Sequence, residues 1–372
     1  KQKQVRDNLE RIAKADCSKM MYILPSAIQK EYRNKLEFTF STKSWKQDYD
    51  KDAIDNGAFG FHVPGFFDKV LEIDYCALQS EPSNAIRNHL RDYCSKRSLP
   101  YYNIREHSGL MRNLIVRTST TGDVMVIVVF AQRSEEIVPL LENLRENFPQ
   151  ITSLMYCINE KFNDTLGDQD IKCFAGKDHI EERMTSFDGK GELRFKIRPK
   201  TFYQTNSLQA EKLYHQAAEF AGITKDDIVY DLYTGCGTIA NYVASLSKKV
   251  VGIEYVEDAV EDARLNSEFN NINNTTFFAG DMAKILTEEF IEQNGRPDVI
   301  ITDPPRAGMA ESVINQLLAT KARKIVYISC NPATQARDLV LLQSKYAVGR
   351  IRPVDMFPHT QHVENIVELI LK

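Results

Sequence analysis

The sequence predicts an α/β protein, with a doubly wound domain preceded by an α+β domain that has an antiparallel sheet. From Asp227 onward, apolar runs alternate with helical patterns, and the first run leads into the glycine turn Asp231-Leu-Tyr-Thr-Gly-Cys-Gly-Thr238. Before about residue 190, strands and helices follow one another without this alternation. The length of 372 residues exceeds one ordinary core. We therefore expect two domains, 1–192 and 193–372.

The first domain opens on a helical pattern, with Val5 and Leu9 on its apolar face and no cap before it. This abrupt start predicts a piece of a longer protein. Residues 59–67 are rich in aromatics and glycine, and residues 161–191 are polar, which predicts a loop or a short hairpin. The other expected elements are strands at 32–40, 70–75 and 154–159, a hairpin at 110–130, and helices at 82–93 and 137–144.

The second domain is expected to hold a mixed sheet of seven strands, with ligands at the carboxyl ends of the parallel ones. At the start of this domain and before its sheet, the run 193–203 carries alternating cations, which either contact phosphates or protect an edge strand. The seven predicted strands are 227–231, 249–254, 275–281, 298–303, 324–330, 350–356 and 363–371.

The glycine turn predicts a nucleoside site. Gly235 and Gly237 let the backbone turn tightly and pass close to a ligand. The third glycine of the dinucleotide fingerprint is missing, which favours a mononucleoside such as S-adenosylmethionine. Glu254 ends the second strand, where a carboxylate can bridge ribose hydroxyls. Asp281 ends the third, where it either accepts the adenine amino group or caps a helix.

Three later strand ends also carry chemistry. In Asp303-Pro-Pro-Arg306, the prolines stiffen the loop, and Arg306 replaces the aromatic residue of amine methyltransferases, which argues against amine chemistry. Cys330 ends the fifth strand, and a nucleophilic thiol there needs local activation. Glu364, beside two histidines, is a candidate general base. The histidine spacing lacks the helical pattern of a zinc protease, so a metal is disfavoured.

Composition indicates a soluble globular protein, with 43% hydrophobic and 26% charged residues. No apolar run approaches a membrane span, and no signal peptide is visible. The seven cysteines show no CxxC pair, which argues for reduced thiols in a cytoplasm. The net charge of −4 does not announce a nucleic-acid binder, although a local basic face would suffice. We expect a cytoplasmic monomer without membrane contact.

Five motifs in order resemble the RNA uracil-5-methyltransferase family, whose bacterial members modify ribosomal RNA or tRNA. They are Gln204-Thr-Asn206, Asp231 to Gly237, Asp303 to Arg306, Ser329-Cys330-Asn-Pro332 and His362-Val-Glu364-Asn365. Tyr32-Arg-Asn-Lys35 and Asn163-Asp-Thr165 also look like the family's central domain. The resemblance implies a Rossmann-like class I domain that uses S-adenosylmethionine, RNA as the partner, and 5-methyluridine as the product.

The resemblance also implies residue roles. Cys330 adds to uracil C6, and Glu364 removes the C5 proton. Asp303 and Arg306 orient the base, which has to leave its stack. The residues that match or neighbour the family's cofactor contacts are Gln204, Tyr233, Glu254, Asp303, Thr238 and Asp281, with Gly235 and Gly237 in the turn.

Many relatives carry an N-terminal RNA-binding barrel and then three cysteines that bind a [4Fe–4S] cluster with a fourth. Cys76 matches that fourth ligand, so we expect the cluster in the full-length protein only, because a cubane needs four ligands. The alternative is a plain buried thiol in a cluster-free branch. The implied upstream barrel and Cys76 favour 23S ribosomal RNA as the substrate over tRNA.

Two other functions stay open at this point. The first is a class I methyltransferase acting on another atom, such as C5 of cytosine or a purine. Cytosine enzymes typically carry a cysteine beside the motif at 303–306, and none is present. The second is a non-catalytic RNA-binding or ribosome-assembly factor on the same fold, against which the presence of both Cys330 and Glu364 argues.

Overall fold

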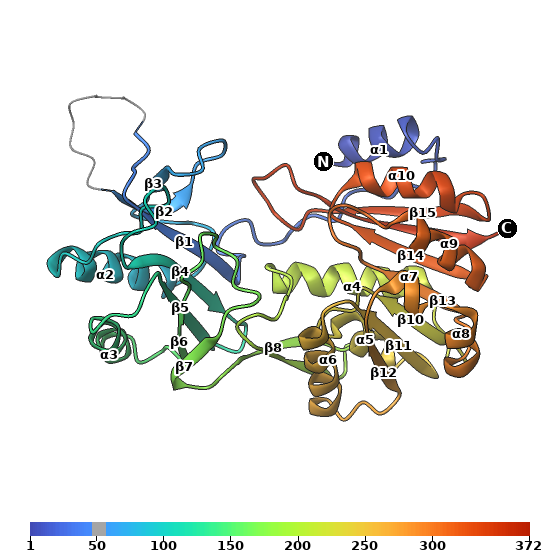
Figure 1. The fold of residues 1–372 in the computed structure, drawn as a ribbon. Coiled ribbons are helices and arrows are strands. Elements are labelled where there is room, and N and C mark those ends of the chain that lie inside the picture. The colour runs from blue at the N-terminus through green and yellow to red at the C-terminus, as the bar shows by residue number, and fades with distance from the viewer. Residues whose placement is uncertain (47–56) are drawn as a thin grey trace. The chain divides into compact units, whose positions relative to one another are not determined.

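The computed structural model describes residues 1–46 and 57–372, which divide into two compact units (Figure 1). The C-terminal unit comprises residues 1–29, 183–196 and 201–372, and the central unit comprises 30–182 and 197–200. The boundary expected from the sequence, between 192 and 193, lies near the points at 182–183, 196–197 and 200–201 where the chain passes from one unit to the other. Residues 1–29 differ, because they group with the C-terminal unit rather than with the first domain.

The C-terminal unit is built on a mixed sheet of seven strands, as the sequence predicts. Five strands are parallel, β16 runs antiparallel to β14, and β15 pairs antiparallel with β16. In spatial order the strands are β12 (Thr275–Ala279), β11 (Lys249–Glu254), β10 (Ile228–Leu232), β13 (Val299–Thr302), β14 (Lys324–Ser329), β16 (Glu364–Leu371) and β15 (Tyr346–Val354).

Helices cover both faces of this sheet (Figure 1). One apolar cluster joins Tyr230, Ile300, Tyr327 and Val367 to the first helix group: α1 (Gln2–Arg11), α7 (Met282–Ile285), α8 (Glu288–Asn294), α9 (Glu311–Thr320) and α10 (Pro332–Leu342). The second group packs on the strands from the other side: α4 (Ser207–Ala221), α5 (Thr238–Ala244) and α6 (Glu257–Phe269). Side chains alternate between the two faces of a sheet. On each of these strands, the residues on either side of the cluster position therefore face the second helix group.

The first residues of the chain are part of the C-terminal unit. Helix α1 packs on α10, and residues 20–24 continue alongside β15, where the Met21 amide donates to the Ile351 carbonyl at 2.9 Å. The Lys1 ammonium pairs with Asp355 at 2.6 Å. The apolar stripe of α1 showed that the helix is amphipathic, but a stripe does not specify its partner.

The central unit holds a second seven-stranded sheet, antiparallel except for the parallel pair β5–β6. Helices α2 (Ser83–Lys96) and α3 (Ile137–Asn147) share one apolar cluster with it. In spatial order the strands are β3 (Val70–Glu72), β2 (Ala58–His62), β1 (Lys35–Ser41), β4 (Met111–Thr118), β5 (Val124–Phe130), β6 (Ser153–Ile158) and β7 (Ile171–Gly176).

Strand β7 lies in the segment that was expected to be a loop or a short hairpin. Its residues are half-buried or exposed without a clear alternation, so periodicity did not reveal it. The short strands β8 (Ile180–Thr185) and β9 (Glu192–Ile197) form a two-stranded sheet. On β9, the Arg194 and Lys196 cations lie 5.2 and 4.6 Å from the centre of the Phe269 ring. In the described residues, no helix has the length and apolar character needed to cross a membrane.

Candidate functional site

The glycine turn joins β10 to α5, and its two glycines serve different purposes. Both have left-handed backbones, with φ of +53° at Gly235 and +78° at Gly237, which glycine adopts without strain. A Cβ on Gly237 would lie 2.9 Å from the Ala263 Cβ on α6, whereas a Cβ on Gly235 would meet nothing within 4 Å. Gly237 therefore allows the helices to pack, and Gly235 borders open space at the end of the strand.

Glu254 connects three strand ends. Its carboxylate accepts from the amides of Gly235 at 3.1 Å and Tyr255 at 2.8 Å. Its carbonyl accepts from the amide of Gly280, which follows β12, at 2.8 Å. The ends of β10, β11 and β12 are thus joined through this one residue, next to the point between β10 and β13 where the strand order reverses and where doubly wound sheets bind ligands.

The remaining expected cofactor residues lie around this turn or at the same strand ends. Thr238 is the buried first residue of α5, and its hydroxyl is 3.3 Å from the Cys236 thiol. That thiol donates to the carbonyl of Phe202 at 3.4 Å, so the segment carrying the buried Gln204 runs beside the turn. Asp281 caps α7 by accepting from the Ala283 amide at 3.0 Å, the ordinary capping role considered for it.

Three carboxylates and the cysteine share one face of the sheet. Asp231 and Glu364 lie directly next to residues of the first apolar cluster, so alternation directs both toward the second helix group. Asp303 and Cys330 directly follow β13 and β14; Asp303 lies near Tyr214 on α4, and Cys330 lies near Asp303 and Glu364. The pairing of β14 with β16 sets Ser329 opposite Asn365. Extending this register by one position sets Cys330 opposite Glu364, and residues opposite each other in an antiparallel pair have Cβ atoms about 5 Å apart. The thiol is close enough to Glu364 for that carboxyl to raise its pKa.

The carboxyls in this group resist ionisation. Burial raises the pKa of Asp231 to about 7, despite hydrogen bonds from the Thr234 hydroxyl and the Ala240 amide. Burial also raises the pKa of Asp303, as does the nearby Asp231. Glu364 is only 4% exposed, and burial followed by the charge of Asp303 raises its pKa.

A fourth carboxyl on the same face shows what the site acids lack. Burial opposes the ionisation of Glu368, but its bonds to Arg350 and Lys324 outweigh that effect and hold its pKa at about 2. Within residues 1–46 and 57–372, no lysine or arginine forms an ion pair with Asp231, Asp303 or Glu364, and Asp231 Oδ1 has no hydrogen-bond partner. Buried acids without a cation fit a positively charged ligand.

The Cys330 thiol is half-buried, and burial raises its pKa to about 11, with further contributions from Glu364 and Asp303. The exposed Arg306 acts in the opposite direction and favours the thiolate. A nucleophilic Cys330 therefore needs an added positive charge, because its surroundings are acidic without a ligand.

The loop that carries Arg306 is fastened to α10. The Arg306 carbonyl accepts from Asn331 and from the Thr334 hydroxyl, both at 3.2 Å. Two residues on, Gly308 has a φ of +77°, and a Cβ there would lie 2.7 Å from the Asp338 carboxylate. These contacts hold residues 303–308 against the helix that follows Cys330.

A buried amide network holds the two strands that carry the cysteine and the glutamate. Gln335 on α10 donates to the carbonyls of Tyr327 at 3.0 Å and Asn365 at 3.2 Å, and it accepts from the Asn365 amide at 2.7 Å. Both amide side chains are fully buried. The hydrogen bonds of Gln335 thus tie α10 to both β14 and β16, the strands that lead to Cys330 and Glu364.

Substitution of Gln335 by leucine is expected to lower the free energy of unfolding by about 1–3 kcal/mol, because the buried Asn365 amide loses its acceptor. Urea unfolding measures this change. The matched control is Gln216→Leu on α4, whose side chain bonds Glu219 at the surface, and it should stay within about 0.5 kcal/mol of the parent. Equal losses in the two variants would show that the network contributes nothing.

Tyr214 belongs to the site and was not predicted. It lies on α4, is 5% exposed, and burial raises its pKa, followed by the charges of Asp303, Cys236, Asp231 and Glu364. In the sequence it falls on the apolar stripe of a helix, so it could not be told from a core residue. Its place in the site is evident only from the packing of α4 against the face of the sheet that carries Asp231, Asp303 and Glu364.

Cys76 lies in the central unit, 7% exposed, with its backbone bonded to the Asn84 side chain at 2.8 and 3.2 Å. The described part of the chain contains no group of three or more His, Cys, Asp or Glu residues able to hold a metal ion. One thiol cannot hold a four-iron cluster, so that cluster does not fit this chain alone. Its presence in a longer protein stays a prediction.

Comparison with known proteins gives the family. A family model described as tRNA (Uracil-5-)-methyltransferase matches residues 167–372. An uncharacterised RNA methyltransferase of Bacteroides thetaiotaomicron is 54% identical over 100% of this chain and 82% of its own, and one of Porphyromonas gingivalis is 52% identical over 100% and 81%.

Among solved structures, the tRNA (uracil-54, C5)-methyltransferase of Pyrococcus abyssi, in complex with S-adenosyl-L-homocysteine, is similar with a TM-score of 0.76 and 28% identity, over 98% of this chain and 82% of that one. The resemblance inferred from five motifs, the fold class and the enzyme class are confirmed. The chain belongs to the RNA uracil-5-methyltransferase family.

Proposed function

We propose that this protein transfers a methyl group from S-adenosylmethionine to C5 of a uridine in RNA, through a covalent bond between Cys330 and uracil C6. The observation that carries the proposal is the pairing of Ser329 with Asn365 at the end of β14 and β16, because the next residues outward are Cys330 and Glu364 and the thiol lies near Glu364 and Asp303. A pyrimidine is a planar ring small enough to contact a thiol and a carboxylate about 5 Å apart.

The cofactor site is supported by the turn and by the buried acids. Gly235 leaves room for a ligand beside the backbone, and Glu254 stands at the end of the neighbouring strand. We assign S-adenosylmethionine to Gln204, Tyr233, Glu254 and Asp303, with Thr238, Asp281 and the two glycines at its edge. The cofactor supplies a methyl group on a positively charged sulfur, which matches a region of buried carboxyls without cations.

The residues of this chain provide three steps. The Cys330 thiolate forms a bond to C6, and the electrons of the C5–C6 double bond move toward C4 and its oxygen, which makes C5 nucleophilic. C5 takes up the methyl group, whose bonding electrons stay on the departing sulfur. Glu364 then accepts the C5 proton, the double bond reforms, and the C6–sulfur bond breaks to release the thiolate.

Positive charge is required at the first step. The sulfonium and Arg306 both favour the thiolate over the thiol, in surroundings where burial and two acids disfavour it. We assign Arg306 to orienting the uracil, from a loop that α10 holds in place. The target nucleotide has to leave its stack to reach Cys330, and an unpaired uridine does so at the lowest cost.

The affinity for S-adenosylmethionine is expected to rise with pH between about pH 6 and pH 9, by about fivefold or more. Raised pKa values keep Asp303 and Glu364 partly protonated at neutral pH, and a cation binds the ionised form better, so affinity increases as the protons leave. Isothermal titration calorimetry at several pH values measures it. S-adenosylhomocysteine, which is uncharged at sulfur, should show a flatter profile, and Asp303→Asn should flatten the profile of the cation. Identical slopes for the two ligands would contradict this electrostatic account.

We propose 23S ribosomal RNA as the substrate, because Cys76 stands where cluster-binding relatives have their fourth ligand. A second candidate is a tRNA uridine, which the solved relative from Pyrococcus abyssi favours. Mapping 5-methyluridine in both RNAs from cells that lack the gene decides between them. Loss of one ribosomal position supports the first, loss from tRNA supports the second, and an unchanged pattern in both would refute the activity.

A further inference from the structure

In the described part of the central unit, three phenylalanine side chains are exposed on loops. Phe66, Phe67 and Phe162 show 48%, 63% and 70% of their surface to solvent. The first two lie in the connection between β2 and β3, and the third follows β6. Single exposed apolar residues are ordinary, but rings that gather on loops mark interaction sites.

One turn connects the rings from the two loops. In residues 103–108, the Asn103 amide donates to the Ser108 carbonyl at 2.7 Å, which closes the turn. The Arg105 guanidinium lies 5.0 Å from the centre of the Phe67 ring. The His107 ring lies 4.1 Å from Phe162 with a tilt of 30°. Two side chains of this turn therefore stand against two rings contributed by separate segments.

Two of the nitrogen-bearing side chains beside these rings, Arg105 and His107, are bonded to buried residues. Arg105 donates through Nε to Asp68 at 2.7 Å, and Asp68 is 8% exposed while Arg105 remains largely exposed. Lys69 lies 5.5 Å from the Phe66 ring. The Tyr102 hydroxyl is 3.2 Å from His107 Nδ1. Each exposed ring is thus paired with a nitrogen-bearing side chain.

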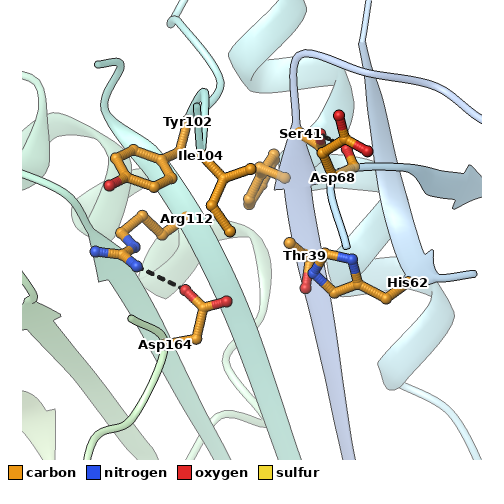
Figure 2. A pocket seen from close by; sticks show the side chains of 9 residues that line it. Thr39, Ser41, His62, Asp68, Tyr102, Ile104, Arg112 and Asp164 are labelled. Carbon is orange, nitrogen blue, oxygen red and sulfur yellow. Dashed lines mark hydrogen bonds and ion pairs between the residues drawn. The ribbon is translucent and has the colours of Figure 1, made fainter. Parts of the chain in front are cut away.

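A small pocket of the central unit is lined by Asp68, Tyr102, Arg112 and Asp164, among others, and Figure 2 shows the bond from Arg112 to Asp164. Arg112, only 1% exposed, extends from β4 and donates to the carbonyls of Asn159 and Asn163 and to the Asp164 carboxylate at 2.7, 3.0 and 2.6 Å. Its guanidinium lies 4.3 Å from the centre of the Tyr102 ring. The loop with Phe162 and Tyr102, the residue before the 103–108 turn, both contact this one buried cation.

We propose that Phe66, Phe67 and Phe162, with Lys69, Arg105 and His107, form a stacking platform for unpaired RNA bases. The proposal rests on the proposed function only in taking RNA as the partner. Every base has a face that stacks on an exposed ring, and cations beside the rings attract the phosphates. Interleaved rings and cations suit a single strand better than duplex RNA, whose bases are not accessible for stacking.

Fluorescence anisotropy with a short labelled oligouridine tests the platform. The double variant Phe67→Ala, Phe162→Ala should bind about tenfold or more weakly, because stacking on each ring is lost, while Phe67→Trp with Phe162→Trp should bind like the parent. Val138→Ala on α3, an exposed apolar residue away from the loops, is the matched control and should show no change. Arg105→Gln should reduce the slope of log affinity against log salt by about one.

Thermal unfolding of each variant shows that the fold is intact. Unchanged oligouridine affinity in the double alanine variant would overturn the proposal, as would equal losses on blunt duplex RNA. If the double alanine variant keeps its RNA affinity but no longer self-associates in sedimentation, the surface is a protein contact, and the proposal is also overturned. Weaker binding by a protein that transfers no methyl group would support the platform and refute the proposed chemistry, so the two failures are distinguishable.

Discussion

Substitution of Cys330 by alanine is expected to lower methyl transfer to RNA by about 10⁴-fold or more, because the reaction loses its nucleophile. Without the bond to C6, uracil C5 lacks the electron density to attack a methyl sulfonium. The loss should appear in kcat, since the residues that we propose to contact the cofactor lie at other strand ends. A radiolabelled methyl-transfer assay on the mapped RNA measures it.

The exposed Cys173 on β7 provides the control for this substitution. Cys173→Ala should be as active as the parent. Cys330→Ala should still bind S-adenosylhomocysteine with nearly unchanged affinity, which separates a lost nucleophile from a damaged site. Substantial turnover by Cys330→Ala would mean that the methyl group reaches the base without a covalent adduct.

Substitution of Glu364 by glutamine is expected to lower turnover by about 10²–10⁴-fold, because a positioned base is removed. The effect should differ in kind from that of Cys330→Ala. The bond to C6 and methylation at C5 precede the proton transfer, so the enzyme should stop as a methylated covalent adduct. Denaturing gel electrophoresis with labelled RNA should show this adduct accumulating in Glu364→Gln.

Glu292→Gln, at an exposed carboxylate on α8, is the control and should leave turnover unchanged. An inactive Glu364→Gln without accumulated adduct would place Glu364 before bond formation. In that case, it would orient the base or the thiol rather than remove the C5 proton.

The sequence predicted the C-terminal sheet well for a physical reason. Parallel strands are buried on both faces, so β10, β11, β13 and β14 appear as apolar runs between glycine turns and helices. A polar residue follows each apolar run at the carboxyl edge of the sheet, where ligands are expected to bind. This is why the sequence alone indicated the candidate residues at the strand ends. Cys330 and Glu364 became candidates through their positions at the ends of apolar strands, and the family resemblance added the roles proposed for them.

Other features depend on contacts that no local pattern encodes. The stripe on α1 did not show that it packs on α10, and residues 20–24 have no signature for lying beside β15. The amide network of Gln335 and Asn365 joins residues 30 positions apart. Tyr214 is equally consistent with an ordinary core position. Tertiary packing, rather than propensity, decides each of these cases.

Mass spectrometry of the complex with 5-fluorouridine RNA and S-adenosylmethionine tests the central claim most directly. Fluorine at C5 cannot leave as a proton does, so the reaction should stop after methyl transfer. We expect a covalent adduct carrying both RNA and the transferred methyl group, on the peptide that contains Cys330. Absence of any adduct, or an adduct on another cysteine, would contradict it.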